Sequence, residues 1–154
     1  MSEIQRIDHV GIAVADLDEA IRLYTLLLGR GPDAVEEIPD QKVRVAFFRA
    51  GDSHIELVCP TSDTSPISGF LAKRGGGIHH ICLAVPDLSR ALAELQAHGM
   101  QLLDSVPRPG ARGKRIAFLH PRALGGVLLE LSESPRPSPC TPHPHTPHTG
   151  PQPD

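Results

Sequence analysis

Two stretches of the chain, seventy-one residues apart, carry the same order of apolar and polar positions. Each stretch is typical of a strand that runs into the start of a helix. The likeness between the two halves then continues along the chain. The matching segments are 7–17 with 78–88, 45–47 with 116–118 and, after a three-residue insertion, 55–57 with 129–131. The chain is therefore predicted to contain two copies of one structural unit.

Each copy is predicted to fold as a β-α-β-β-β unit. In the first copy Asp16 is a candidate N-cap with Glu19 three residues on, and Gly29 ends the helix. Apolar residues at helical spacing predict a stripe on this helix, formed by Ala20, Leu23, Tyr24, Leu27 and Leu28. The matching helix of the second copy is expected at residues 88–98. The predicted strands span 4–15, 34–38, 42–49 and 54–58 in the first copy, and 78–85, 101–105, 114–119 and 126–131 in the second.

These elements predict an α+β fold in which two tandem βαβββ modules form one cupped sheet. We expect a single domain over residues 4–133, with module one at 4–59, a connector at 60–77 and module two at 78–133. The connector carries a short predicted helix with Ser65 as its N-cap. Residues 134–154 are rich in Pro and His and lack apolar periodicity, which predicts a disordered tail.

Composition narrows the possible partners and compartments. The net charge of −3 and the lack of a Lys/Arg block argue against nucleic acid or an anionic membrane as a partner. No run approaches the roughly 18–20 apolar residues of a membrane span, and the first residues do not read as a signal peptide. Three unpatterned cysteines fit a reducing compartment better than a disulfide scaffold. We therefore expect a cytoplasmic protein.

Each copy holds one matching histidine near its start and one matching glutamate near its end, namely His9, Glu56, His80 and Glu130. A single strand histidine or glutamate is ordinarily a hydrogen-bonded or solvent-facing residue. Both glutamates, however, stand among aliphatic residues, where a carboxylate is costly to bury unless a positive charge meets it. Four such residues at repeat-related positions predict a divalent metal site.

The donor set of this site narrows the metal and its role. Two imidazole nitrogens and two carboxylate oxygens suit Co²⁺, Ni²⁺, Zn²⁺, Mn²⁺ or Fe²⁺. Because no cysteine is among the ligands, we expect an open site with Lewis-acid chemistry rather than a closed structural one. Strand alternation points His79 to the face opposite His80, so His79 is left out of the site. Cys82 shares the His80 face and is expected in the pocket wall.

The chain resembles the vicinal oxygen chelate (glyoxalase-like) superfamily and, within it, the methylmalonyl-CoA epimerases. The likeness covers roughly residues 4–133. The segments that carry it are 7–14 (IDHVGIAV), 65–77 (SPISGFLAKRGGG), 79–81 (HHI) and 113–130 (GKRIAFLHPRALGGVLLE). The His and Glu positions are common to the superfamily, whereas the SPI connector and the GKxIAFLHP run are specific to the epimerases.

The resemblance implies an isomerase of propionate metabolism that interconverts the 2R and 2S forms of methylmalonyl-CoA. It implies metal-assisted removal of the α-proton through an enediolate, with Co²⁺ as the expected ion and Ni²⁺, Zn²⁺ or Mn²⁺ as alternatives. By family position His9, Glu56 and His80 match metal ligands, and Glu130 matches a ligand that also acts as a base. An acyl-CoA substrate and a homodimer are expected as partners. Candidate substrate-binding residues are Ser65, Lys114 and His120.

The sequence departs from the family at one position and leaves two rival functions open. Some members have a second glutamate base where this chain has Val45. Glu56, a metal-bound water or a pocket histidine such as His120 are the alternatives for that role. One rival function is a lyase of the glyoxalase I type acting on a glutathione hemithioacetal, which uses the same kind of ligand set. The other is a non-catalytic ligand-binding protein of this fold.

Overall fold

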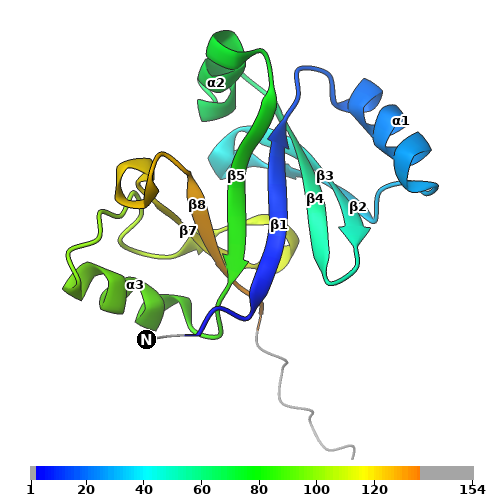
Figure 1. The fold of residues 1–154 in the computed structure, drawn as a ribbon. Coiled ribbons are helices and arrows are strands. Elements are labelled where there is room, and N and C mark those ends of the chain that lie inside the picture. The colour runs from blue at the N-terminus through cyan, green and yellow to red at the C-terminus, as the bar shows by residue number, and fades with distance from the viewer. Residues whose placement is uncertain (1–2, 136–154) are drawn as a thin grey trace, which may run out of the picture.

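Short runs of β-branched and aliphatic residues form one curled, mixed sheet of eight strands in the computed structural model, which describes residues 3–135 (Figure 1). The strand order is β2-β3-β4-β1-β5-β8-β7-β6. The strands are β1 (Arg6–Ala13), β2 (Ala34–Ile38), β3 (Val43–Ala50), β4 (Ser53–Pro60), β5 (Gly77–Ala84), β6 (Arg108–Pro109), β7 (Arg115–Leu119) and β8 (Leu129–Glu133). The helices are α1 (Leu17–Leu28), α2 (Pro66–Arg74) and α3 (Leu88–Ala97), with short 3-10 turns η1 (Pro39–Gln41), η2 (Ala111–Gly113) and η3 (Pro121–Leu124).

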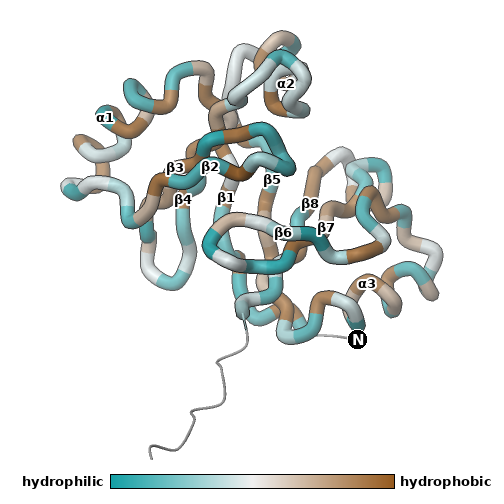
Figure 2. The backbone as a smooth tube through the Cα atoms, turned by 180° about the vertical axis from the view of Figure 1, so that it is seen from behind, coloured by the Kyte–Doolittle hydropathy of each residue, from teal (hydrophilic) through white to brown (hydrophobic). Residues whose placement is uncertain are grey.

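The two halves of the sheet repeat each other around the central pair of strands. β1 and β5 pair antiparallel at the centre, β4 pairs parallel with β1, and β8 pairs parallel with β5. The predicted pair of βαβββ modules around one cupped sheet is thereby confirmed. Viewed from behind, the segment between β6 and β7 crosses the inner side of the sheet (Figure 2). The strands β4, β1, β5 and β8, two from each copy, lie side by side at the centre of the sheet, and the candidate site is built on them.

Capping residues start and end the helices largely as the sequence predicts. Asp16 accepts a hydrogen bond from the backbone N–H of Glu19 at 3.0 Å, and Gly29 ends α1 in the left-handed conformation. The side chain of Glu19 bonds Arg22 rather than completing a capping box. Ser65 accepts from the N–H of Ile67, and this cap fixes the start of α2.

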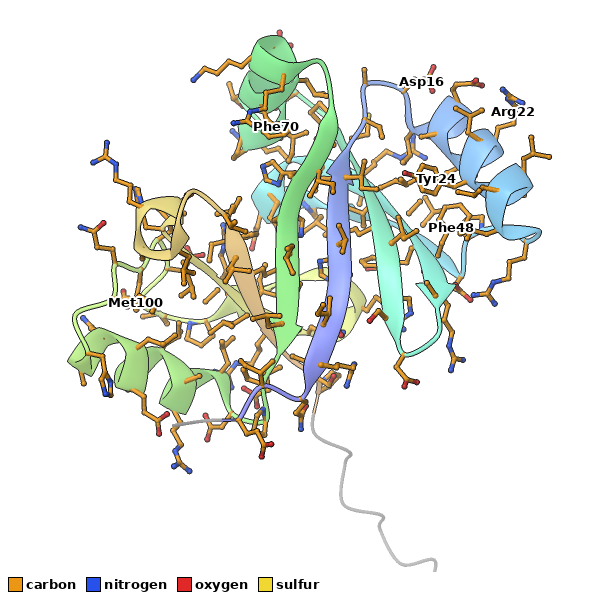
Figure 3. All side chains as sticks on the ribbon, in the orientation of Figure 1. Asp16, Arg22, Tyr24, Phe48, Phe70 and Met100 are labelled. Atoms are coloured by element: carbon orange, nitrogen blue, oxygen red, sulfur yellow. The ribbon has the colours of Figure 1, made fainter. Side chains whose placement is uncertain are left out.

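Only part of the predicted apolar stripe on α1 is buried. Ala20 joins the core, and Tyr24 points at Phe48 of β3 with ring centroids 6.0 Å apart (Figure 3). Leu23 and Leu27 are 48% and 73% exposed, so these two residues of the predicted stripe do not join the core. The reason is that α1 packs against β3 and β4, and the sheet leaves part of the stripe uncovered (Figure 1).

The strand predicted at residues 101–105 is absent from the described structure. Leu102 forms an isolated bridge with Leu119, and the N–H of Phe118 is bonded by the carboxylate of Asp104. The Asp104 side chain thus takes a donor that a longer ladder would need. The segment keeps only a few backbone bonds to the end of β7, at Gln101, Leu103 and Asp104, while β6 pairs with the start of β7. The last strand is also shifted, since β8 begins at Leu129 rather than at residue 126.

Residues 136–154, most of the predicted tail, lie outside the described residues. Among residues 3–135, no helix is both long enough and apolar enough to cross a membrane.

Candidate active site

The four repeat-related residues come together on neighbouring strands. His9 is on β1, Glu56 on β4, His80 on β5 and Glu130 on β8, and each is only 4–6% exposed. The Nε2 atoms of the two histidines are 3.0 Å apart. Oε2 of Glu56 lies 3.3 Å from Nε2 of His9 and 3.2 Å from Nε2 of His80. Oε2 of Glu130 lies 3.4 Å from Nε2 of His80 and 4.0 Å from Nε2 of His9.

This arrangement fits a divalent cation. Donor atoms that share one ion at about 2.1 Å lie roughly 3–3.5 Å from one another, which matches most of these separations. Two imidazole nitrogens with two carboxylate oxygens are a donor set for borderline divalent ions. His9, Glu56 and His80 also meet as a group whose ligand atoms all lie within 4.8 Å of one another.

A β-bulge brings Asp8 to the same site as His9. Ile7 pairs with Leu83 and His9 pairs with Cys82, so Asp8 is an extra residue in β1. Its Oδ2 lies 2.9 Å from Nδ1 of His9. The ammonium of Lys114 donates to the other carboxylate oxygen, Oδ1, and Nη2 of Arg6 lies 3.2 Å from the same oxygen. The buried carboxylate of Asp8 is therefore paired with two cations and contacts the Nδ1 side of the His9 ring.

A second bulge corrects the prediction made for His79. Gly11 pairs with His80 and Ile12 pairs with Ile78, so His79 is an extra residue in β5. Strand alternation fails at such a residue, and His79 does not point away from His80. Its Nδ1 lies 3.0 Å from Nδ1 of His80, and its ring packs edge-on against Phe70 of α2.

The two glutamates differ in their affinity for a proton. Burial disfavours the charged form of Glu56, yet attraction to His9 and hydrogen bonds from both histidines hold its pKa well below the usual range. The His9 pKa is raised because Glu56 and Asp8 outweigh the burial that lowers it. Burial raises the pKa of Glu130, and the nearby histidines offset only part of this effect. The surroundings thus lower the pKa of Glu56 and raise the pKa of Glu130.

Cys82 touches the site as a neutral hydrogen-bond donor. Burial, followed by the nearby charge of Glu130, raises the pKa of its thiol to about 12. The thiol donates to Oε1 of Glu130 over 3.5 Å. The pKa of the neighbouring His79 moves in the opposite direction: burial and, to a smaller degree, the charge of His80 lower it to about 4.

Comparison with known proteins assigns the chain to a family. Residues 8–118 match the Glyoxalase/Bleomycin resistance protein/Dioxygenase superfamily. An ethylmalonyl-CoA/methylmalonyl-CoA epimerase of Cereibacter sphaeroides is 43% identical over 132 residues, which are 84% of this chain and 98% of that protein. The chain belongs to the methylmalonyl-CoA epimerase family. Lactoylglutathione lyases are more distant, and one from Arabidopsis thaliana is 29% identical over 86% of this chain and 38% of its own length.

Solved structures of epimerases share the fold. The methylmalonyl-CoA epimerase of Mycobacterium tuberculosis is 40% identical with a TM-score of 0.83, covering 90% of this chain and 92% of that one. A methylmalonyl-CoA epimerase in complex with methylmalonyl-CoA and NH₄⁺ is 37% identical with a TM-score of 0.81, covering 86% and 96%.

A cavity of about 390 Å³ opens over the centre of this epimerase-family chain. Glu56, His80 and His79 line it, whereas Glu130 lines a smaller hollow that Glu56 and His9 also line. The rest of the larger wall is mainly apolar and includes Val43, Val45, Val58, Ile67, Leu103, Phe118 and Leu128. Lys42 and Arg108 are the cationic side chains of its described lining. Val45, buried at 1% exposure, gives this wall no proton-transferring group.

The three candidate substrate-binding residues lie in different places. Ser65 is a buried cap beneath α2, next to cavity-lining Pro66. The ammonium of Lys114 is committed to Asp8 at 2.6 Å, at the edge of the smaller hollow. His120 caps η3 by accepting from the N–H of Arg122 and is not among the lining residues of either hollow. The structure does not bring these three together.

Sequence reasoning missed Asp8, His79 and Gly11. Asp8 and His79 occupy equivalent places in the repeat, each directly before a histidine of the quartet, and that coincidence was the available signal. Gly11 is needed because a Cβ there would lie 2.7 Å from Nε2 of His80 and closer still to Cε1 and Nδ1. The His80 ring therefore lies directly over the backbone of β1.

Proposed function

We propose that this protein interconverts the 2R and 2S forms of methylmalonyl-CoA by removing and returning the α-proton. The observation that carries the proposal is the buried quartet of two histidines and two glutamates, of which Glu56 and His80 line the larger cavity. It is supported by relatives named as methylmalonyl-CoA epimerases, one of them in complex with methylmalonyl-CoA.

His9, Glu56, His80 and Glu130 would hold a divalent cation, for which Co²⁺ is our first candidate and Ni²⁺, Zn²⁺ and Mn²⁺ are alternatives. A cation held there would stabilise the negative charge that develops on the oxygens of the substrate as the α-proton leaves. Asp8 and Lys114 keep the His9 ring in one orientation. Because the ligands come from four paired strands, they need little rearrangement when the site is used.

Two carboxylates are available to move the proton. We assign Glu130 as the base that takes the α-proton, and the electron pair of the broken C–H bond enters the enediolate. Glu56 is the candidate that gives a proton to the opposite face of the α-carbon, because Glu56 lines both hollows whereas Glu130 lines only the smaller one. With Val45 unable to accept a proton and His120 outside both hollows, Glu56 takes the role that a further glutamate has in some relatives.

The lining of the cavity suits an α-methyl thioester of coenzyme A. Val45, Val58 and Ile67 offer an apolar surface for the methyl group, and all are at most 5% exposed. Lys42 donates to Oγ1 of Thr64 at 2.7 Å, and Nε of Arg108 lies 3.3 Å from Oδ2 of Asp104. These two cations would also contact the carboxylate of the substrate or the phosphates of coenzyme A. Arg108 lies over the Phe118 ring at 5.3 Å, which holds its guanidinium at the cavity wall.

We further propose a homodimer that works in the cytoplasm. No helix of the described chain covers the outer face of β1 and β5, which lies between α1 and α3 (Figure 1). Ile7 and Ile78 are 49% and 66% exposed on these strands, and a second copy would bury such an apolar surface. Light scattering should give a dimer for the wild type and a monomer for Ile78→Glu, and an unchanged mass would exclude this face.

The proposed cytoplasmic location is supported by the cysteines of the described residues. The thiols of Cys59 and Cys82 are free, as suits a reducing compartment.

The function is tested by assaying the metal-loaded protein on two substrates. We expect 2S-methylmalonyl-CoA to be converted to a mixture of both epimers, measured with an enzyme that consumes only the 2R form. A glutathione hemithioacetal should not be isomerised. Turnover of the hemithioacetal without turnover of methylmalonyl-CoA would replace the epimerase assignment by the lyase one.

A further inference from the structure

The residues directly before His9 and His80 are related by the internal repeat and are both bulged. Asp8 and His79 are each seventy-one residues from the other and each is the extra residue of its strand. Bulges commonly turn a side chain that would otherwise face away from a site. Here both bulges turn the preceding side chain toward the histidine that follows it, from opposite ends of the same strand pair.

The two contacts are made at the same atom of each histidine. Oδ2 of Asp8 is 2.9 Å from Nδ1 of His9, and Nδ1 of His79 is 3.0 Å from Nδ1 of His80. In both rings Nε2 is left to face the centre of the quartet. The pattern is that of a ligand histidine whose outer nitrogen is fixed by a partner.

One proton fits between the two facing Nδ1 atoms of His79 and His80. An imidazole that offers the lone pair of Nε2 to a cation keeps its proton on Nδ1. That proton must be donated, and Nδ1 of His79 is the acceptor at 3.0 Å. His79 then has to carry its own proton on Nε2, the nitrogen that does not face His80.

The His79 ring is itself held in place by its neighbours. Phe70 of α2 packs edge-on against it with centroids 4.9 Å apart, and the His79 and His80 rings stand at 86° to each other. His79 is also half-buried in the wall of the larger cavity. Its position therefore depends on packing as well as on the hydrogen bond.

We propose that His79 is the positioning residue of His80: it accepts the Nδ1–H of His80 and thereby aims the Nε2 lone pair at the cation, as Asp8 does for His9. The inference rests on the proposed metal site and goes beyond the four ligands. The two copies of the repeat thus use an anionic partner in one case and a neutral one in the other.

The test compares two replacements of His79 by their zinc affinity, measured in competition with a chromophoric chelator. His79→Phe keeps a ring against Phe70 but has no acceptor, and we expect a loss of about 10–100-fold in affinity. His79→Asn brings a carbonyl oxygen close to the place of Nδ1 and should retain most of the affinity. His98→Phe, at an exposed histidine that ends α3, is the matched control and should bind as the wild type does.

A spectroscopic readout separates positioning from general loss of structure. In the zinc-loaded protein, the Nδ1–H proton of His80 should give a slowly exchanging NMR signal in the wild type and in His79→Asn, and not in His79→Phe. Wild-type affinity in His79→Phe, or equal losses in both variants, would overturn the inference while leaving the metal site intact. A wild type that binds no zinc would overturn the metal site and this inference together. Zinc binding without epimerisation would overturn only the proposed function.

Discussion

Replacing Glu130 by Gln is expected to lower the epimerisation rate of methylmalonyl-CoA by about 10²–10⁴-fold, the usual contribution of a positioned acid or base. The side chain keeps its shape and one oxygen, but it can no longer take a proton. Because Glu130 is buried and burial raises its pKa, its surroundings favour the proton-carrying form that a base must reach during turnover. The rate should be measured at saturating metal so that a weaker ligand set does not mimic a lost base.

Two further variants make this result interpretable. Glu37→Gln, at an exposed glutamate of β2, is the control and should have wild-type turnover. Glu56→Gln should slow inversion as well, because we assign Glu56 to the opposite face of the α-carbon. Wild-type turnover in metal-loaded Glu130→Gln would show that Glu130 does not carry the proton.

Substituting Gly11 by Ala is expected to abolish metal binding although it removes no ligand. The new Cβ would overlap the ring of His80, 2.7 Å from Nε2 and closer to Cε1 and Nδ1. The His80 ring is packed between His9, His79 and Phe118, so the ring cannot move aside at small cost in free energy. We expect the metal content per chain to fall as far as it does in His80→Ala.

The control for this substitution is Gly69→Ala in α2, where a Cβ would meet no atom within 4 Å. That variant should keep its metal and, if anything, gain stability from the higher helix propensity of alanine. Full metal content in Gly11→Ala would mean that His80 ligates from a different position or not at all.

The two-module sheet and the meeting of the quartet could be anticipated because the chain is an internal duplication. Corresponding residues of the two copies occupy corresponding places in the sheet, so His9 and Glu56 lie on one pair of neighbouring strands and His80 and Glu130 on the other. Helix ends at Asp16, Gly29 and Ser65 were equally readable, since caps are local. These features depend on few residues and on contacts close in sequence.

The features that sequence reasoning missed depend on contacts between distant segments. Alternation put His79 on the wrong face because the bulge that turns it arises from the pairing of β5 with β1. The strand predicted at 101–105 was lost to the Asp104 side chain, which occupies the N–H of Phe118. The exposure of Leu23 and Leu27 follows from where α1 lies on the sheet, which periodicity within one helix does not determine.

Solvent isotope incorporation tests the proposed reaction most directly. When the metal-loaded protein turns over 2S-methylmalonyl-CoA in deuterated water, we predict deuterium at the α-carbon, measured by mass spectrometry of the recovered thioester. Exchange should stop when the metal is chelated and should be lost in Glu130→Gln. Conversion of one epimer to the other with the original hydrogen fully retained, or exchange that persists in Glu130→Gln at the wild-type rate, would contradict proton removal by this residue.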